Sequence, residues 1–173
     1  ISNNSTDEDN ALTIAVSASD IDGDALQYSA VSDPADAFST LSFTGYQLTM
    51  VPVTNYNGSA NISVTVTDGE LSDNESFTLT INPVNDAPGL SSINDVTFDE
   101  DSQTSIIVTP QDVDGDELVV ALFTENNDLF PEGTISISPN PADGGTDVTV
   151  TFAPEQNGNG TADFVMSVTD GEY

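Results

Sequence analysis

Asn61-Ile62-Ser63-Val64-Thr65-Val66-Thr67-Asp68-Gly69-Glu70 alternates apolar and polar residues and then runs into Asp-Gly. β-branched residues that alternate with Ser and Thr are typical of a strand with one buried and one exposed face. An Asp-Gly pair is typical of a turn. The stretch therefore predicts a half-buried β-strand that ends in a tight turn.

The same alternation occurs in several other segments, and no segment shows a sustained helical period. The segments span residues 12–16, 77–81, 148–152 and 164–168. Clusters of Gly, Pro, Asn and Asp separate them and predict turns. We therefore expect an all-β chain of short antiparallel strands, folded as a β-sandwich.

The chain also repeats itself. Asp7-Glu8-Asp9 returns 92 residues later as Asp99-Glu100-Asp101, and the Asp-x-Asp-Gly-Asp loop at 20–24 returns at 112–116. Because the stretch 66–70 returns 102 residues later, at 168–172, the second copy has about ten extra residues. A repeat of this length predicts two copies of one structural module.

These offsets predict two domains, 1–86 and 87–173, with the extra residues between 126 and 145. Residues 82–88 form the expected linker. The second repeat has no counterpart of the strand predicted at 77–81, which leaves an open sheet edge. We expect either that the chain is a piece of a longer one, or that another chain supplies the strand by β-augmentation.

Composition excludes many functions. The 173 residues include 30 acidic side chains and no Lys, Arg, His or Cys, giving a net charge of −30. Without these residues there is no imidazole base, thiolate nucleophile, zinc-thiolate site or phosphate-binding lysine. Nucleic acid and anionic membranes are poor partners for such a chain. There is also no apolar run of membrane-spanning length. We expect no enzyme activity.

The acidic residues gather in the turns between strands. In a sandwich, alternate loops lie at the same end, so we expect stacked repeats to bring together the acids of the first turn, the linker and the second Asp-x-Asp loop. Ca²⁺ takes six to eight oxygen ligands and suits carboxylates that have no basic partner. A polar turn without metal is the alternative for a lone loop, but two matched copies favour Ca²⁺.

Five motifs in order resemble those of bacterial cadherin-like tandem repeats: the Glu-Asp opening, Asp-x-Asp-Gly-Asp, Asn-Tyr-Asn-Gly at 55–58, Val-Thr-Asp-Gly and Val-Asn-Asp-Ala-Pro at 84–88. Such repeats occur in long arrays in secreted or surface proteins, including adhesins. The resemblance implies two tandem Greek-key β-sandwiches of the cadherin or immunoglobulin type, the second lacking its last strand. It also implies a Ca²⁺ junction, with fewer ions than in cadherins because Asn55-Tyr56-Asn57 replaces a charged motif. The implied and candidate ligands are Glu8, Asp9, Asp20, Asp22, Asp68, Asn85, Asp86, Glu100, Asp112, Asp114 and Asp170.

The expected function is that of a Ca²⁺-stiffened spacer or adhesive segment of an extracellular, cell-surface or matrix protein. Its partners would be neighbouring repeats, like chains, or a glycan or protein receptor at the cell surface. Two alternatives stay open. The chain could be a carbohydrate- or ligand-binding accessory module of a secreted enzyme, or a filament subunit that accepts a strand from its neighbour.

Overall fold

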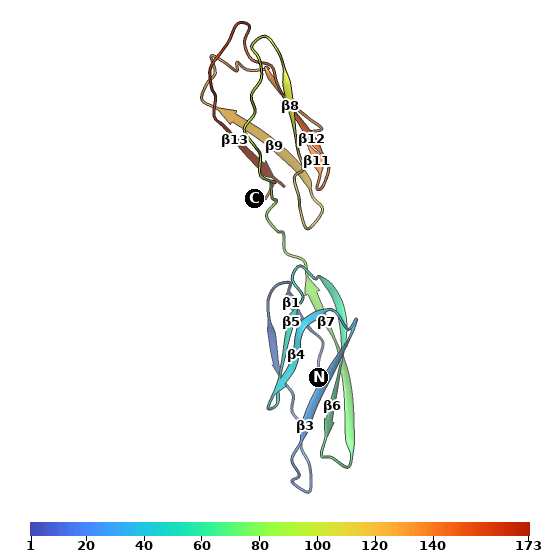
Figure 1. The fold of residues 1–173 in the computed structure, drawn as a ribbon. Helices are drawn as coiled ribbons and strands as arrows, with labels where there is room; N and C mark the ends of the chain where they lie inside the picture. The colour runs from blue at the N-terminus through green and yellow to red at the C-terminus, as the bar shows by residue number, and fades with distance from the viewer. The chain divides into compact units, whose positions relative to one another are not determined.

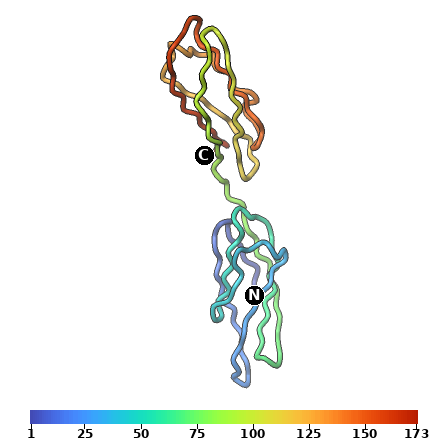
Figure 2. The backbone as a smooth tube through the Cα atoms, viewed as in Figure 1, coloured from blue at the N-terminus to red at the C-terminus, as the bar shows by residue number.

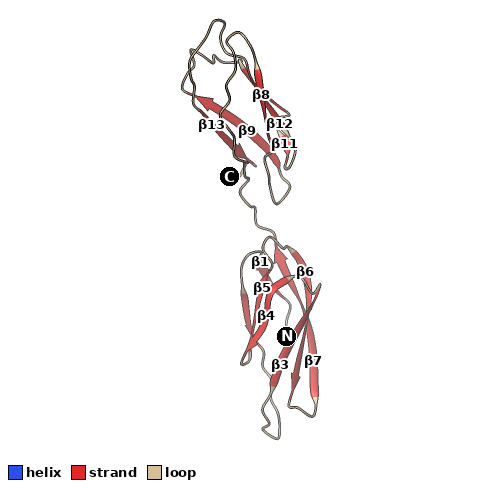
Figure 3. Ribbon diagram, viewed as in Figure 1, coloured by secondary structure: helices blue, strands red, loops and turns tan.

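The computed structural model describes residues 1–173 and divides into two compact units, Ile1–Val84 and Asn85–Tyr173 (Figures 1 and 2). The division lies just before Asn85, whereas the repeat offsets placed it after Asp86. The chain consists of strands and loops (Figure 3), which confirms the all-β class. No helix of the kind that could cross a membrane is present.

Unit 1 is a sandwich of two sheets. One sheet has the order β1-β7-β6-β3 and the other β2-β5-β4. Strand β1 runs parallel to β7, and the other pairs are antiparallel. The strands are β1 (Asn4–Asp7), β2 (Leu12–Ala15), β3 (Gln27–Asp33), β4 (Phe38–Thr44), β5 (Gln47–Pro52), β6 (Gly58–Thr67) and β7 (Ser72–Asn82).

The apolar residues of alternate positions form the core of unit 1. Ile62 and Val64 of β6 are 0% and 2% exposed, as the alternation predicts. Leu48 of β5 and Leu79 of β7 are both fully buried against them in the same cluster. Removal of this apolar surface from water is the main stabilising term of the unit.

Unit 2 repeats the sandwich with one strand fewer. Its sheets have the orders β10-β12-β8 and β11-β9-β13. Strand β13 pairs with β9 alone, which confirms that the second sandwich lacks the last strand of the first. The strands are β8 (Thr104–Val108), β9 (Glu117–Thr124), β10 (Ile135–Ser138), β11 (Ala142–Asp143), β12 (Val148–Phe152) and β13 (Phe164–Thr169).

The extra residues of unit 2 pack into its own core. Phe130 is 6% exposed, and its ring lies edge-on to Phe152 and Phe164, with centroids 6.2 and 5.1 Å away. The side-chain amide of Asn140 pairs with the backbone of Val120 in β9, as a neighbouring strand would. It accepts a hydrogen bond from the Val120 N–H at 2.9 Å and donates one to the Val120 carbonyl at 2.8 Å. The insertion therefore contributes an apolar side chain to the core of unit 2 and hydrogen bonds to the backbone of β9, in addition to lengthening a loop.

Candidate functional site

In both units the same side-chain hydrogen bond joins two turns at one end of the sandwich, and we call it the clasp. The Asp9 carboxylate accepts the Asn55 N–H at 3.1 Å, and the Asp101 carboxylate accepts the Asn157 N–H at 2.7 Å. All four residues have φ near 58°, a left-handed conformation that Asp and Asn tolerate better than most residues. Asp9 was predicted as a metal ligand, and one of its oxygens is engaged in this clasp.

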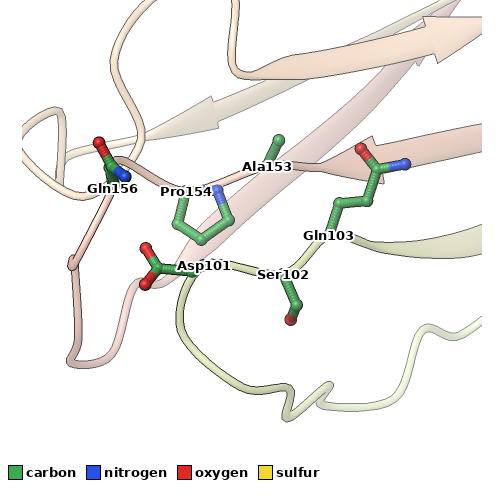
Figure 4. Close-up of a pocket in the computed structure, with 6 residues that line it drawn as sticks. All are labelled: Asp101, Ser102, Gln103, Ala153, Pro154 and Gln156. Carbon is green, nitrogen blue, oxygen red and sulfur yellow. The ribbon is translucent and has the colours of Figure 1, made fainter.

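A shallow hollow lies beside the clasp of unit 2 (Figure 4). It measures about 310 Å³ and is lined by Asp101, Ser102, Gln103, Ala153, Pro154 and Gln156. Its single carboxylate, that of Asp101, already holds the turn. The hollow therefore groups no set of oxygen ligands.

Glu8 is the one buried charged residue, with 2% of its surface exposed. Its carboxylate accepts the Val84 N–H at 2.6 Å and lies 3.5 Å from the Asn57 Nδ2, while its own N–H donates to the Asn82 carbonyl. A buried carboxylate needs such donors when no cation is present. Glu8 thus ties the chain after β7 to the turn after β1. Its counterpart Glu100, also a predicted ligand, is exposed.

At the other end of unit 1, the predicted ligands Asp20 and Asp68 stabilise two turns by accepting backbone hydrogen bonds. The Asp20 carboxylate accepts the N–H groups of Asp22 and Asp24, at 2.8 and 3.1 Å. Asp68 accepts those of Leu71 and Glu70, both at 2.7 Å. These N–H donors, that of Leu71 most strongly, lower the pKa of Asp68, because they stabilise the charged form. Pairing of β3 with β6 places the two turns at the same end of the sheet.

The matching loop of unit 2 brings its three acids together. Carboxylate oxygens of Asp112, Asp114 and Asp116 all lie within 4.8 Å of one another, a grouping that the structure shows in unit 2 and not in unit 1. Asp112 Oδ1 accepts the N–H groups of Gly115 and Asp116. The other oxygen, Oδ2, is buried and has no hydrogen-bond partner. Gly115 has φ of 80°, which lets the loop turn back on itself.

The linker residues bind to this same end of unit 2. The Asp86 N–H donates to Asp114 Oδ2 at 2.8 Å, and Asn85 Nδ2 donates to Asp170 Oδ2 at 2.7 Å. The Tyr173 N–H and, more weakly, the Asn85 amide lower the pKa of Asp170 against the effect of desolvation. We name this group the linker-end cluster: Asn85, Asp86, Asp112, Asp114, Asp116 and Asp170.

The linker-end cluster fits a calcium ion by its chemistry. It supplies carboxylate and amide oxygens only, and the buried Oδ2 of Asp112 is an acceptor that no protein donor satisfies. Asp116 was not among the predicted ligands, although its place as the third Asp of the Asp-x-Asp-Gly-Asp loop could have indicated it. Calcium binding stays a prediction.

Comparison with known proteins gives matches over both units. A family model described as Bacterial Ig domain matches residues 1–82 and 85–173. Chitinase A of Pseudoalteromonas piscicida is 30% identical over 106 residues, which is 60% of this chain and 13% of that protein. The chain therefore spans a small part of this curated relative.

Two solved structures are similar over nearly the whole chain. Human protocadherin-24 EC1-2 aligns with 97% of this chain and 90% of its own, with a TM-score of 0.51 and 15% identity, and so shares the fold. The endo-fucoidan hydrolase MfFcnA4 aligns with 98% of this chain and 25% of its own, with a TM-score of 0.40 and 17% identity. The expected Ig-like or cadherin-like module is confirmed at this level, and a specifically cadherin-like bacterial repeat stays a prediction.

Proposed function

The chain belongs to the Bacterial Ig domain family, and from that membership we propose that its two repeats form a calcium-binding spacer segment of an extracellular or cell-surface protein. The observation behind the proposal is the linker-end cluster, in which three carboxylates lie within 4.8 Å in a chain without any Lys, Arg or His. Two carboxylates at that separation repel by about 1 kcal/mol even at the dielectric constant of water. A divalent cation would turn this repulsion into attraction.

Calcium would act on the linker because two linker residues belong to the cluster. Asn85 and Asp86 are already hydrogen-bonded to Asp170 and Asp114. An ion held by the acids of the loop would strengthen this attachment, since it binds the folded arrangement and not the detached one. The linker would then be less free to move, which suits a segment that holds other domains at a distance.

The net charge of −30 fits the proposed location. Extracellular calcium modules bind at about 10⁻⁴ to 10⁻³ M, concentrations of calcium that occur outside cells. Acids that are not engaged as ligands would keep the surface soluble in salt. Neighbouring repeats, like chains, or a receptor on another surface are the partners that a spacer or adhesive segment would have.

The test is a calorimetric calcium titration of the whole chain. Asp112→Asn together with Asp114→Asn keeps side-chain volume and removes two ligand charges. We expect a loss of affinity of roughly tenfold or more, in the range that follows removal of charged ligands. The matched control is Asp33→Asn with Asp36→Asn, which removes the same charge from exposed positions away from the cluster. An unchanged stoichiometry and affinity in the first variant would refute the proposal.

A second function is favoured by the match to chitinase A, in which these repeats would be an accessory module of a secreted enzyme. The module would position its parent enzyme on a polysaccharide without taking part in the reaction. Retention of the purified chain on insoluble chitin, compared with cellulose at the same surface area, tests this. Equal recovery in the unbound fraction from both polymers and from a no-polymer control would count against it.

A further inference from the structure

The outer face of one sheet in unit 2 presents an exposed aromatic side chain next to an exposed valine. Strands β9 and β13 lie side by side in this sheet (Figure 1), and Phe123 of β9 pairs with Val165 of β13. The two residues are 63% and 69% exposed. Single exposed apolar residues are common on protein surfaces, whereas adjacent ones with a polar rim are typical of binding surfaces.

Two carboxylates form part of that polar rim. A groove of about 540 Å³ is lined by Phe123 and Val165 together with Glu125 and Asp163. Both acids are exposed, and neither has a hydrogen-bond or ion-pair partner in the chain. Like charges on paired strands destabilise a sheet. The two acids therefore give the fold no stability by themselves, and they favour a cationic ligand.

Hydrogen bonds fix the end of the groove that carries the acids. Asn126 follows Glu125, and its Nδ2 donates to the Thr161 carbonyl at 2.9 Å. The Asn126 N–H donates to Thr124 Oγ1 at 3.2 Å. These bonds tie the segment after β9 to the segment before β13, so Glu125 and Asp163 belong to segments that are held together. A groove formed in advance loses less entropy when a ligand binds.

The exposure of this face does not depend on what lies beside β13 in the sheet. By the repeat offsets, Val31 of β3 holds the position of Phe123 in unit 1, and it pairs with Ser63 of β6. Strand β7 lies on the other side of β6, yet Val31 is 66% exposed. A neighbouring strand in the same sheet therefore leaves the outer face open.

Unit 1 lacks the combination of side chains that lines the groove in unit 2. It has valine and serine at the two apolar positions, without an aromatic ring. At the positions of Glu125 and Asp163 it has Asp33 and Asn61, a single carboxylate paired with an amide. On this face the aromatic ring and the two acids thus occur together in unit 2 alone, which makes unit 1 an internal comparison.

We propose that this groove of unit 2 binds an arginine side chain of a partner protein. A guanidinium group is a planar cation that stacks on an aromatic ring and donates hydrogen bonds to carboxylates from its edge. Phe123 would contact the flat face of the guanidinium, and Val165 would contact the apolar stem. Glu125 and Asp163 would accept its N–H groups.

Composition and charge decide between the classes of partner. A second copy of this chain has no Arg or Lys to insert and would bring a charge of −30 against an equal charge. Nucleic acid would be repelled for the same reason. A basic protein segment is attracted, and arginine suits the ring and both acids better than lysine, whose ammonium is a point charge. The groove shares no residue with the linker-end cluster, and binding to it requires no calcium.

The test is an NMR titration of the whole ¹⁵N-labelled chain with a blocked peptide of alternating arginine and glycine. It is run in a chelator and at about 20 mM salt, where surface attraction is weakly screened. We expect the largest amide shifts in β9 and β13 around the groove. A peptide with citrulline in place of arginine keeps the shape without the charge and should bind at least about tenfold more weakly. A lysine peptide should bind roughly threefold more weakly than the arginine peptide.

Two variants of the chain make the result specific. Phe123→Val introduces the residue found at this position in unit 1 and should abolish the preference for arginine over lysine. Glu125→Gln with Asp163→Asn should weaken binding about tenfold, because two charges are lost at unchanged volume. The matched control is again Asp33→Asn with Asp36→Asn, which should leave the affinity unchanged.

Four results would overturn the proposal. The first is equal binding of the citrulline peptide, and the second is unchanged affinity in both variants of the groove. The third is a shift of equal size at the linker-end cluster, because that would be a response to charge alone. The fourth is tighter binding of a glucosamine trimer than of the arginine peptide, which would assign the groove to an amino sugar.

Discussion

Replacement of Glu8 tests whether a buried carboxylate stabilises unit 1 without any cation beside it. Glu8→Ala removes the acceptor of the Val84 N–H, at 2.6 Å, and of the Asn57 amide, at 3.5 Å. Hydrogen bonds to a charged group contribute about 1.5–3 kcal/mol net, and only the short one has good geometry. We therefore expect a loss of about 2 kcal/mol in the free energy of unfolding of unit 1.

Urea denaturation in a chelator measures this loss apart from any role in calcium binding. With a slope of about 1–2 kcal/mol per molar urea for a unit of this size, the midpoint should fall by roughly 1–2 M. Tyrosine fluorescence follows mainly unit 1, because three of the four tyrosines, Tyr28, Tyr46 and Tyr56, lie there. Glu100→Ala is the matched control at the exposed counterpart and should leave the midpoints unchanged. A Glu8→Ala midpoint within about 0.2 M of the parent chain would refute the reasoning.

Three further predictions concern the core, the insertion and the acids. Leu48→Ala empties a fully buried site and should destabilise unit 1 by about 2–5 kcal/mol, with the unit 2 transition unchanged in calorimetry. Asn140→Ala leaves both backbone groups of the buried residue Val120 without their side-chain partners, and should lower the stability of unit 2 by about 1–3 kcal/mol in urea denaturation. The Leu71 N–H is the main cause of the lowered pKa of Asp68, so the stability that this carboxylate contributes is present above the ordinary value of 3.8 and is lost as pH falls through the folded-state pKa. A ¹³C carboxyl titration should show Asp68 protonating at a lower pH than the exposed acids. A titration midpoint at or above those of the exposed acids would contradict the assignment.

Much of the fold could be predicted from the sequence because the information is local. Alternation such as Ile62, Val64 and Val66 identifies strands wherever one face is buried. The repeat of the Asp-x-Asp-Gly-Asp loop identified two modules. The candidate site was predictable in part, since the acids of 112–116 and the linker lie in one end of unit 2, as expected from the alternation of loops in a sandwich.

The rest depended on contacts between distant segments. Phe130 belongs to the insertion, where no periodicity marks it, and it is buried because Phe152 and Phe164 surround it. Asp116 is a local exception. Its place as the third Asp of the loop could have indicated it, and closure of the loop around Gly115 brings its carboxylate to within 4.8 Å of those of Asp112 and Asp114.

The two Asp-Glu-Asp motifs, at 7–9 and 99–101, show most clearly what the local sequence decides and what the tertiary structure decides. By itself the sequence determined that both motifs lie in a turn, because turn chemistry is local. Asp9 and Asp101 adopt the same φ of 58° and make the same hydrogen bond to a second turn. Only the tertiary structure decided that Glu8 is buried. The reason is that burial of a carboxylate requires donors from elsewhere in the chain, and the segment after β7, 76 residues away, supplies the Val84 N–H to Glu8.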